Sequence, residues 1–260
     1  MPYICVAIDE GTTLKYHNLH FVLECPKSLE LKSYQFDTIR MKGSKAKHYV
    51  DSIYTGFKLL IAAKINIGSI VCDGNTAQKK AFDVDWEESI RYKEDIEDIK
   101  SIIYIPCLCH RVENSYKSAA MKNEDLKSIL DILHNVEEEC QEASYLIGST
   151  CPSHCTTRWL YDYDIVTFII KNKENISKNL IHGNEVPFEL FVHLRKCLVI
   201  LKTLLLLFET PKTKFQFAFT YLERGINALF ELSREQKNPY ASCLAYSLQS
   251  YTLFSAESGL

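Results

Sequence analysis

Two stretches decide the predicted fold: Ile4-Cys5-Val6-Ala7-Ile8-Asp9 and Ser69-Ile70-Val71-Cys72-Asp73-Gly74. Each is a short apolar run, rich in β-branched residues, that ends on or next to an aspartate. Such a run is typical of a buried strand that carries a carboxylate to the edge of a sheet. An aspartate is equally common there as a turn residue or an N-cap, so the pair gains meaning only from its surroundings.

The two aspartates, Asp9 and Asp73, are candidates for a metal site. Carboxylates on adjacent parallel strands can hold hard divalent cations such as Mg²⁺ or Mn²⁺, which prefer oxygen ligands. Paired metal ions promote phosphodiester chemistry because they activate the attacking oxygen and stabilise the leaving one.

The composition is that of an ordinary globular protein, with 47% hydrophobic and 24% charged residues among 260. This length suffices for one large domain or two smaller ones. The net charge of −3 lacks the global basic signature of a nucleic-acid binder, so such binding would depend on a local patch.

Neither a membrane span nor a secretory signal is expected. The apolar segment 198–208 is too short to cross a bilayer and is interrupted by Lys202, which favours a buried helix. The ten cysteines are scattered and follow no signal peptide, so we expect reduced thiols in the cytosol or nucleus and no secretion.

Hydrophobic periodicity predicts strands in the first part of the chain, at residues 3–9, 20–25, 31–39, 67–73 and 102–105. A turn is expected at 11–13, and an acidic helix at 85–100. A further helix, capped by Ser44, is expected from 45 to about 66 with one apolar face: Val50, Ile53, Tyr54, Phe57, Leu60 and Ile61.

After Cys107 the period-2 signal ends, and helices are expected at 110–122, 124–144, 158–180, 187–208 and 212–233. Three antiparallel strands followed by strand, helix and strand is the plan of the ribonuclease-H-like fold. The predicted architecture is therefore α/β: an incomplete ribonuclease-H-like mixed sheet over 1–106, followed by an all-helical insertion region over 107–260.

Three motifs resemble those of the hAT superfamily of DNA transposases. They are Cys72-Asp73-Gly74-Asn75-Thr76-Ala77-Gln78-Lys79-Lys80-Ala81, Ile105-Pro106-Cys107-Leu108-Cys109-His110-Arg111-Val112-Glu113-Asn114 and Cys155-Thr156-Thr157-Arg158-Trp159. They occur in the family order, and the similarity extends over roughly residues 3 to 230. The ordered set is more specific than any one of its members.

This resemblance implies roles for particular residues. Asp9 and Asp73 would be the first two catalytic, metal-binding carboxylates, and Cys107 and His110 the family's Cys-x-x-His pair. Arg158 and Trp159 would be its Arg-Trp pair, in which the tryptophan stacks on a flipped base near the cleaved end. A tryptophan that opens an apolar helix is also typical of a core residue.

The family's third acid, a glutamate on a helix that returns to the sheet, is not identifiable. Glu257 lies in a segment that does not resemble a long helix, and Glu113 would serve only in an unrelated metal-dependent nuclease. The family's zinc-finger module and dimerisation segment also have no counterpart. The chain is therefore expected to be a fragment or domesticated remnant, and the sequence does not decide whether it is an enzyme.

Two further sets of residues are chemically suggestive. DNA phosphates are expected to contact Lys79, Lys80, Arg111 and Arg158, although a solvated helix face is the ordinary role of such side chains. Zinc is the less favoured use of the groups at 107–110 and 151–155, because long helices separate them: Cys107, Cys109, His110, Cys151, His154 and Cys155. Instead, Cys107 and His110 are expected to pack and hydrogen-bond.

The function predicted first is a transposase-derived, nuclear DNA-binding domain of a transposable element. Its ancestral reaction would be metal-dependent DNA strand cleavage and transfer, as in DNA recombination, with homo-oligomers in the full-length family. The alternative is a non-catalytic protein-interaction scaffold built on the helical region. The DNA sequence recognised and the oligomeric state are not encoded in a recognisable way.

Overall fold

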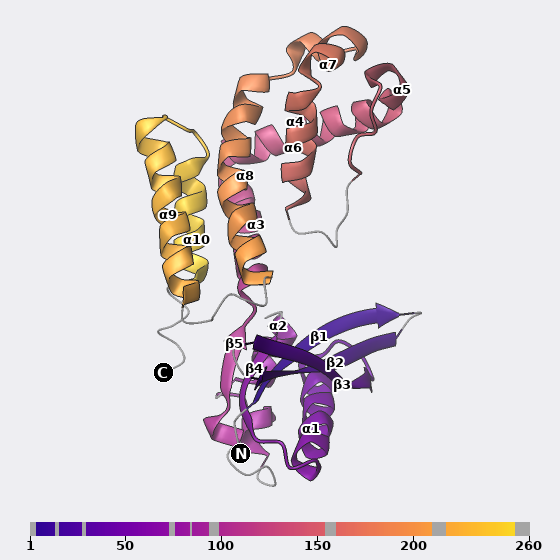
Figure 1. The fold of residues 1–260 in the computed structure, drawn as a ribbon, viewed down its shortest axis with the longest axis vertical. Coiled ribbons are helices and arrows are strands. Elements are labelled where there is room, and N and C mark those ends of the chain that lie inside the picture. The colour runs from indigo at the N-terminus through magenta and orange to yellow at the C-terminus, as the bar shows by residue number, and fades with distance from the viewer. Residues whose placement is uncertain are drawn as a thin grey trace. The chain divides into compact units, whose positions relative to one another are not determined.

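The computed structural model describes residues 4–13, 16–27, 30–72, 76–83, 85–93, 99–153, 160–209 and 217–252 (Figure 1). The chain is a mixed α/β protein that divides into two compact units, Met1–His110 and Arg111–Leu260. We call these the sheet unit and the helical unit. The division falls inside a helix, a few residues after the boundary of 106 and 107 expected from the sequence.

The described residues of the sheet unit form a sheet of five strands in the order β3-β2-β1-β4-β5 (Figure 1). β1 pairs antiparallel with β2, and β2 antiparallel with β3, whereas β1 and β4, and β4 and β5, are parallel. The strand bounds are β1 Ile4–Thr13, β2 Tyr16–Lys27, β3 Glu30–Met41, β4 Ile67–Cys72 and β5 Ile103–Pro106.

The turn expected at residues 11–13 is wrong, because β1 continues through these residues. Gly11 pairs with Asn18 and Thr13 with Tyr16, so the β1–β2 ladder reaches the end of both strands. Glycine and threonine are compatible with a strand when a partner strand satisfies their backbone groups.

Helix α1 (Ala46–Ala62) supplies one wall of the core of the sheet unit. Its residues Ile53, Phe57 and Leu60 are fully buried, in agreement with the predicted apolar face, but Ile61 is 43% exposed. The predicted cap is also wrong, since Lys45 occupies the N-cap position and no side chain caps the helix. Ser44 lies one residue too early to reach the first free N–H groups.

The described residues between 85 and 100 do not form the acidic helix expected from the sequence. They form two short 3₁₀ helices, η1 (Ile90–Tyr92) and η2 (Ile99–Ser101), and a helix not foreseen, α2 (Thr76–Ala81), precedes them. Ile90 and Ile99 are both buried in the core of the sheet unit. Residues nine apart lie on opposite sides of a helix, so Ile90 and Ile99 could not share one apolar face of a single helix. Their tertiary packing therefore overrides the helix propensity of this segment.

The helical unit contains helices and no strand among its described residues (Figure 1). Helix α3 begins at the end of the sheet unit and continues into this one. The bounds are α3 Leu108–Lys122, α4 Glu124–Glu142, α5 Ser144–Ile147, α6 Tyr161–Lys171, α7 Lys173–Asn179, η3 Gly183–Glu185, α8 Phe188–Glu209, α9 Ala218–Glu235 and α10 Ala241–Thr252.

The single helix expected at 158–180 is divided into α6 and α7 within its described part. Asn172 stands between them, and its Nδ2 donates to the carbonyl of Phe168 at 2.9 Å. An asparagine side chain that satisfies a last-turn carbonyl ends a helix in the way that a C-cap does.

Helix α8 is the core helix of this unit, as its apolar sequence predicted. It packs against α6 and α9, and its fully buried residues recur at intervals of three or four: Phe191, Leu194, Leu198 and Leu201. Across the described part of the chain, every helix is too short or too polar to cross a membrane.

We expect Phe57→Ala to destabilise the sheet unit by about 3–5 kcal/mol, because it leaves a cavity beneath a fully buried aromatic ring. Urea unfolding followed by circular dichroism measures the change. Leu59→Ala on the same helix is the control, since Leu59 is 43% exposed and its truncation should change stability much less. Equal losses for the two variants would contradict the packing of α1 described above.

Candidate functional site

The candidate site begins with a row of residues across the three parallel strands. Ile8 of β1 pairs with Cys72 of β4, and Cys72 pairs with Pro106 of β5. The residues that follow this row in the sequence are Asp9, Asp73 and Cys107. β4 and β5 end at this row, whereas β1 continues to Thr13. The carboxyl ends of parallel strands are where sites in α/β proteins commonly form.

The structure describes the backbone of only one of the two predicted metal-binding residues. Asp9 lies in β1, where its backbone pairs with that of His20 in β2, but its side chain is not described. Asp73 lies outside the described residues. The expected proximity of their carboxylates therefore stays a prediction.

Cys107 begins a small thiol and imidazole cluster at the same edge. Its N–H donates to the carbonyl of Cys72 at 2.7 Å, which extends the β4–β5 pairing by one residue. The Cys107 sulfur accepts hydrogen bonds from the side chains of Cys109 and His110 in the first turn of α3. The family resemblance pointed to the Cys107–His110 pair, whereas Cys109 was named only in the candidate zinc group and not as a partner of Cys107.

This cluster favours the thiolate form of Cys107. The pKa of the Cys107 thiol is lowered to about 4, and the hydrogen bond from Cys109 is the largest cause of this shift. Burial opposes the shift, whereas the hydrogen bonds and charge of His110 reinforce it. The N-terminal end of a helix further favours an anion at this position.

A metal ion at this edge would need oxygen ligands that the described side chains do not supply. Cys72, Cys107 and His110 offer sulfur and imidazole nitrogen, which suit softer ions than Mg²⁺. No group of three or more His, Cys, Asp or Glu side chains in the described part of the chain is arranged to hold a metal. Any Mg²⁺ or Mn²⁺ site would therefore depend on Asp9 and Asp73.

The predicted phosphate-binding lysines lie on α2, close in sequence to Asp73. Lys79 and Lys80 are both exposed, whereas Gln78 beside them is fully buried and anchors the helix. The Lys80 Nζ lies 5.3 Å from the centroid of the Trp86 ring, a cation–π contact that orients this side chain. Trp86 was missed in the sequence because it stands among acidic residues.

Arg111, the third predicted DNA contact, has a structural role within the helical unit. Its Nη1 donates to the Tyr251 carbonyl of α10 at 2.9 Å. The Ser247 hydroxyl of α10 donates to the Ser115 carbonyl of α3 at 2.6 Å, so the two helices are joined twice. The bond from Arg111 to the Tyr251 carbonyl engages one of the guanidinium nitrogens that a phosphate would otherwise contact.

The predicted Arg158 and Trp159 lie outside the described residues. The next residue, Leu160, adopts a left-handed backbone with φ of 47°, which costs a non-glycine residue roughly 1–2 kcal/mol. Its side chain is 2% exposed, so burial offsets this strain.

Glu113, considered as a third acid, forms an ion pair with Lys117 at 2.8 Å.

A buried polar network follows directly after Leu160 and was not recognised in the sequence. Asp162, at the start of α6, is 4% exposed and accepts a hydrogen bond from the Tyr116 hydroxyl of α3 at 2.6 Å. Its other oxygen lies 2.9 Å from Nε2 of His134 on α4. The Tyr161 hydroxyl lies 3.1 Å from the same nitrogen.

Asp162 thus joins three helices and changes the acidity of its partners. Its hydrogen bond is the largest cause that raises the pKa of His134, while burial opposes this. Burial, followed by the charge of Asp162, raises the pKa of Tyr116 well above its usual value. Tyr116 and His134 are far from Asp162 in the sequence, so the network has no local motif, which explains why sequence analysis overlooked it.

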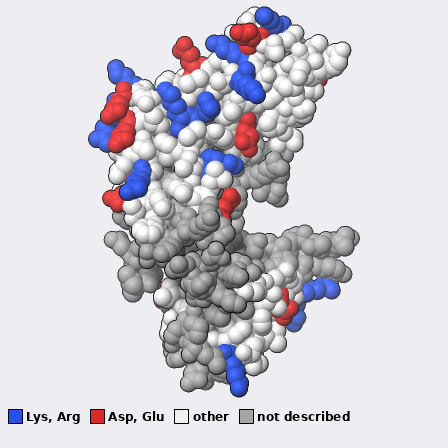
Figure 2. Space-filling model, in the orientation of Figure 1, with Lys and Arg blue, Asp and Glu red and all other residues white. Residues whose placement is uncertain are grey.

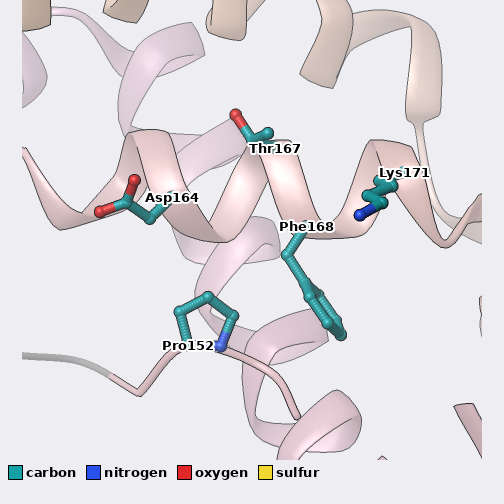
Figure 3. Close-up of a pocket in the computed structure, with 5 residues that line it drawn as sticks. All are labelled: Pro152, Asp164, Thr167, Phe168 and Lys171. Carbon is teal, nitrogen blue, oxygen red and sulfur yellow. The ribbon is translucent and has the colours of Figure 1, made fainter. Parts of the chain in front are cut away.

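An open depression of about 460 Å³ lies on another face of α6 (Figure 3). It is lined by Asp164, Thr167, Phe168 and Lys171, which recur at helical spacing, and by Pro152. Figure 3 shows Phe168 extending from α6 toward the side on which Pro152 lies. The depression offers an aromatic ring, a carboxylate and an ammonium group to a ligand.

No protein-family model and no curated protein matches this sequence. The resemblance to hAT transposases therefore depends on the three motifs and their order alone.

We expect the alkylation rate of Cys107 by iodoacetamide to change little between pH 6 and 8, since its thiol is already ionised. For an ordinary thiol the thiolate fraction rises about tenfold per pH unit in this range. Peptide mass spectrometry at timed intervals measures the rates. Cys243, whose pKa is raised by burial, is the internal control. A tenfold rise per unit at Cys107 would contradict the proposed thiolate.

We also expect the stability that His134 contributes to decrease with rising pH. Its folded-state pKa lies above the usual 6.5, so the contribution is complete below pH 6.5 and is lost as pH rises through the raised value. Urea unfolding of the wild type and of His134→Gln at a series of pH values measures the difference. The same comparison in an Asp162→Asn background is the control, where the pH dependence should largely vanish.

Proposed function

We propose that this protein is a nucleic-acid-binding domain of ribonuclease-H-like topology, derived from a hAT-type DNA transposase. The observation that carries the proposal is the strand order with its directions. A β3-β2-β1-β4-β5 sheet, antiparallel on one side of β1 and parallel on the other, agrees with the topology inferred from the sequence. The first quoted motif begins at Cys72, the last residue of β4, and the second begins at Ile105, within β5.

The register between β1 and β4 supports the placement of the two aspartates. Ile8 pairs with Cys72, so Asp9 follows one member of the pair in the sequence and Asp73 follows the other. Ile8 and Cys72 are buried, at 3% and 1% exposure, and this holds the register, because a slip by one residue would move both out of the core. In the proposed site, Asp9 and Asp73 hold Mg²⁺ or Mn²⁺.

DNA binding by this domain would be modest and electrostatic. The exposed Lys79 and Lys80 lie on α2, three and four residues after its first residue, Thr76. On the face shown in Figure 2, Lys and Arg side chains of the described residues are interspersed with Asp and Glu. With a net charge of −3, we expect only a few phosphate contacts. Localisation to the nucleus is part of the proposal.

The ancestral chemistry would be metal-dependent strand cleavage and transfer, and we propose that this chain does not perform it. When bound, two metal ions activate the attacking oxygen and stabilise the leaving oxygen. Asp9 and Asp73 would supply two carboxylates, and the sequence has no identifiable third acid to complete the set. Fewer ligands hold the ions less firmly, and phosphoryl transfer depends on their positions.

We therefore expect salt-sensitive binding of duplex DNA without nicking or strand transfer. Each neutralised phosphate contributes roughly −0.9 to the slope of log affinity against log salt. A fluorescence-anisotropy titration at several salt concentrations measures the slope, and Lys79→Ala with Lys80→Ala should reduce it by about two units. Lys178→Ala, on α7 in the helical unit, is the matched control for the loss of an exposed cation.

Two outcomes would contradict these expectations. Nicking with Mg²⁺ or Mn²⁺ that Asp73→Ala abolishes would show that the chain is an active enzyme. Failure to bind DNA even at low salt would remove the nucleic-acid function and favour the second candidate.

That second candidate, a protein-interaction scaffold, is favoured by one specific feature of the helical unit. Tyr145 and Leu146 of α5 are 92% and 58% exposed, and Ile181, just after α7, is 92% exposed. Helices α5 and α7 are joined by a hydrogen bond from Asn179 Nδ2 to the Leu146 carbonyl at 3.4 Å. Large exposed apolar side chains on neighbouring elements are typical of protein-binding surfaces.

A further inference from the structure

The open depression on α6 is used neither by the predicted metal site nor by the proposed function. It measures about 460 Å³ and is lined by Asp164, Thr167, Phe168, Lys171 and Pro152 (Figure 3). Known ligand sites measure roughly 300–1,000 Å³, so the depression is large enough to receive a ligand.

Three side chains of α6 form one wall of the depression. Asp164, Phe168 and Lys171 are four and three residues apart, a spacing that places them on the same face of the helix. Figure 3 shows Phe168 between Asp164 and Lys171 along α6. The buried residues of α6 lie on its other face: Asp162, Ile165, Val166 and Ile169. The wall thus offers a carboxylate, an aromatic ring and an ammonium group in that order.

Pro152 lines the depression from a different segment, and the residues before it hold it in place. Cys151 is 3% exposed, which anchors the segment in the core of the helical unit. The Ser149 hydroxyl donates to Asn172 Oδ1 at 3.2 Å, and Asn172 directly follows Lys171, the last residue of α6. Because this bond fastens the segment to the end of the helix, the depression is formed before any ligand binds.

Asp164 and Lys171 carry opposite charges toward the two ends of the depression. Seven residues of helix separate them, which corresponds to a rise of about 10.5 Å along α6. Among the described residues, neither of these two side chains forms an ion pair. A complementary ligand therefore carries two opposite charges at a similar separation, with an apolar part between them that contacts Phe168.

This arrangement favours a peptide in the polyproline II conformation. The backbone groups in the middle of a helix are bonded within it, so α6 offers no edge to which an extended strand could pair. A polyproline II segment needs no such edge, because water solvates its backbone. It has three residues per turn and rises about 3.1 Å per residue, so side chains three apart point the same way at about 9.3 Å. This separation matches that of Asp164 and Lys171 within the reach of their side chains.

We propose that the depression on α6 binds a proline-rich segment of a partner protein, in which a basic and an acidic residue enclose two prolines. The basic residue pairs with Asp164 and the acidic residue with Lys171, while the prolines pack on Phe168 and Pro152. Aromatic-lined grooves that receive proline-rich segments are a recurring mode of peptide recognition. Neither DNA nor a metal ion takes part in this binding.

The test is a nuclear magnetic resonance titration of the isotope-labelled whole chain with a capped peptide, Pro-Arg-Pro-Pro-Asp-Pro, at low salt. We expect saturable amide shifts in α6 between Asp164 and Lys171. Glutamine in place of the peptide's arginine should weaken binding roughly two- to fivefold, the range for an exposed ion pair. The absence of saturable shifts, or shifts confined to other helices, would overturn the proposal.

Protein variants show whether the predicted charges make the contact. In Asp164→Asn, the arginine and glutamine peptides should bind equally, because the partner of the arginine is lost. In Lys171→Gln, asparagine in place of the peptide's aspartate should likewise have no effect. Lys178→Gln, which removes an exposed cation of α7 outside the depression, is the control and should leave both differences unchanged. An arginine effect that persists in Asp164→Asn would contradict the proposed pairing and overturn the proposal.

Discussion

The parallel pairing of β1 with β4 is the constraint on which the sheet unit depends. Adjacent parallel strands cannot be joined by a tight turn, so the chain between them must make a long excursion. Here that excursion supplies β2, β3 and α1, which complete one side of the sheet and cover its apolar residues. The buried Ile8 and Cys72 hold the register. Asp9 in β1 therefore follows the residue that pairs with the last residue of β4, and Cys107 follows the last residue of β5.

The cysteines illustrate how the partner of a thiol decides its chemistry. Cys107 accepts hydrogen bonds at the start of a helix, and its thiolate is stabilised. Cys197 is buried and donates to an amide oxygen, and burial raises its pKa to about 12. The thiols of this chain thus differ in acidity because their burial and their hydrogen-bond partners differ.

The helical unit has a polar centre as well as an apolar core. Asp162 is almost fully buried, and a carboxylate in such a position is destabilising unless several donors surround it. Tyr116 and His134 supply those donors from two other helices, so the relative placement of α3, α4 and α6 is specified by directional bonds. This network begins next to the predicted Arg158 and Trp159, and it fixes the helix that follows them.

The sequence by itself determined the strands and the long helix of the first part of the chain and the change to helices after it. Short apolar runs ending at Asp9 and Asp73 predicted strands, and the spacing of Ile53 and Phe57 predicted a one-faced helix, because burial on one side leaves a repeating pattern. Such patterns suffice to predict an element when its neighbouring residues are buried against the same core. They failed at 85–100, where Ile90 and Ile99 are held by a distant core and not by their neighbours.

Only the tertiary structure decided which distant side chains meet. The row Ile8–Cys72–Pro106 and the Asp162 network each join residues from separate elements. Hydrogen bonds act over about 3 Å, and the spacing of residues along the chain does not reveal which groups approach that closely. The pKa shifts follow from these contacts, so the reactivity of each thiol and carboxylate was beyond the reach of sequence patterns.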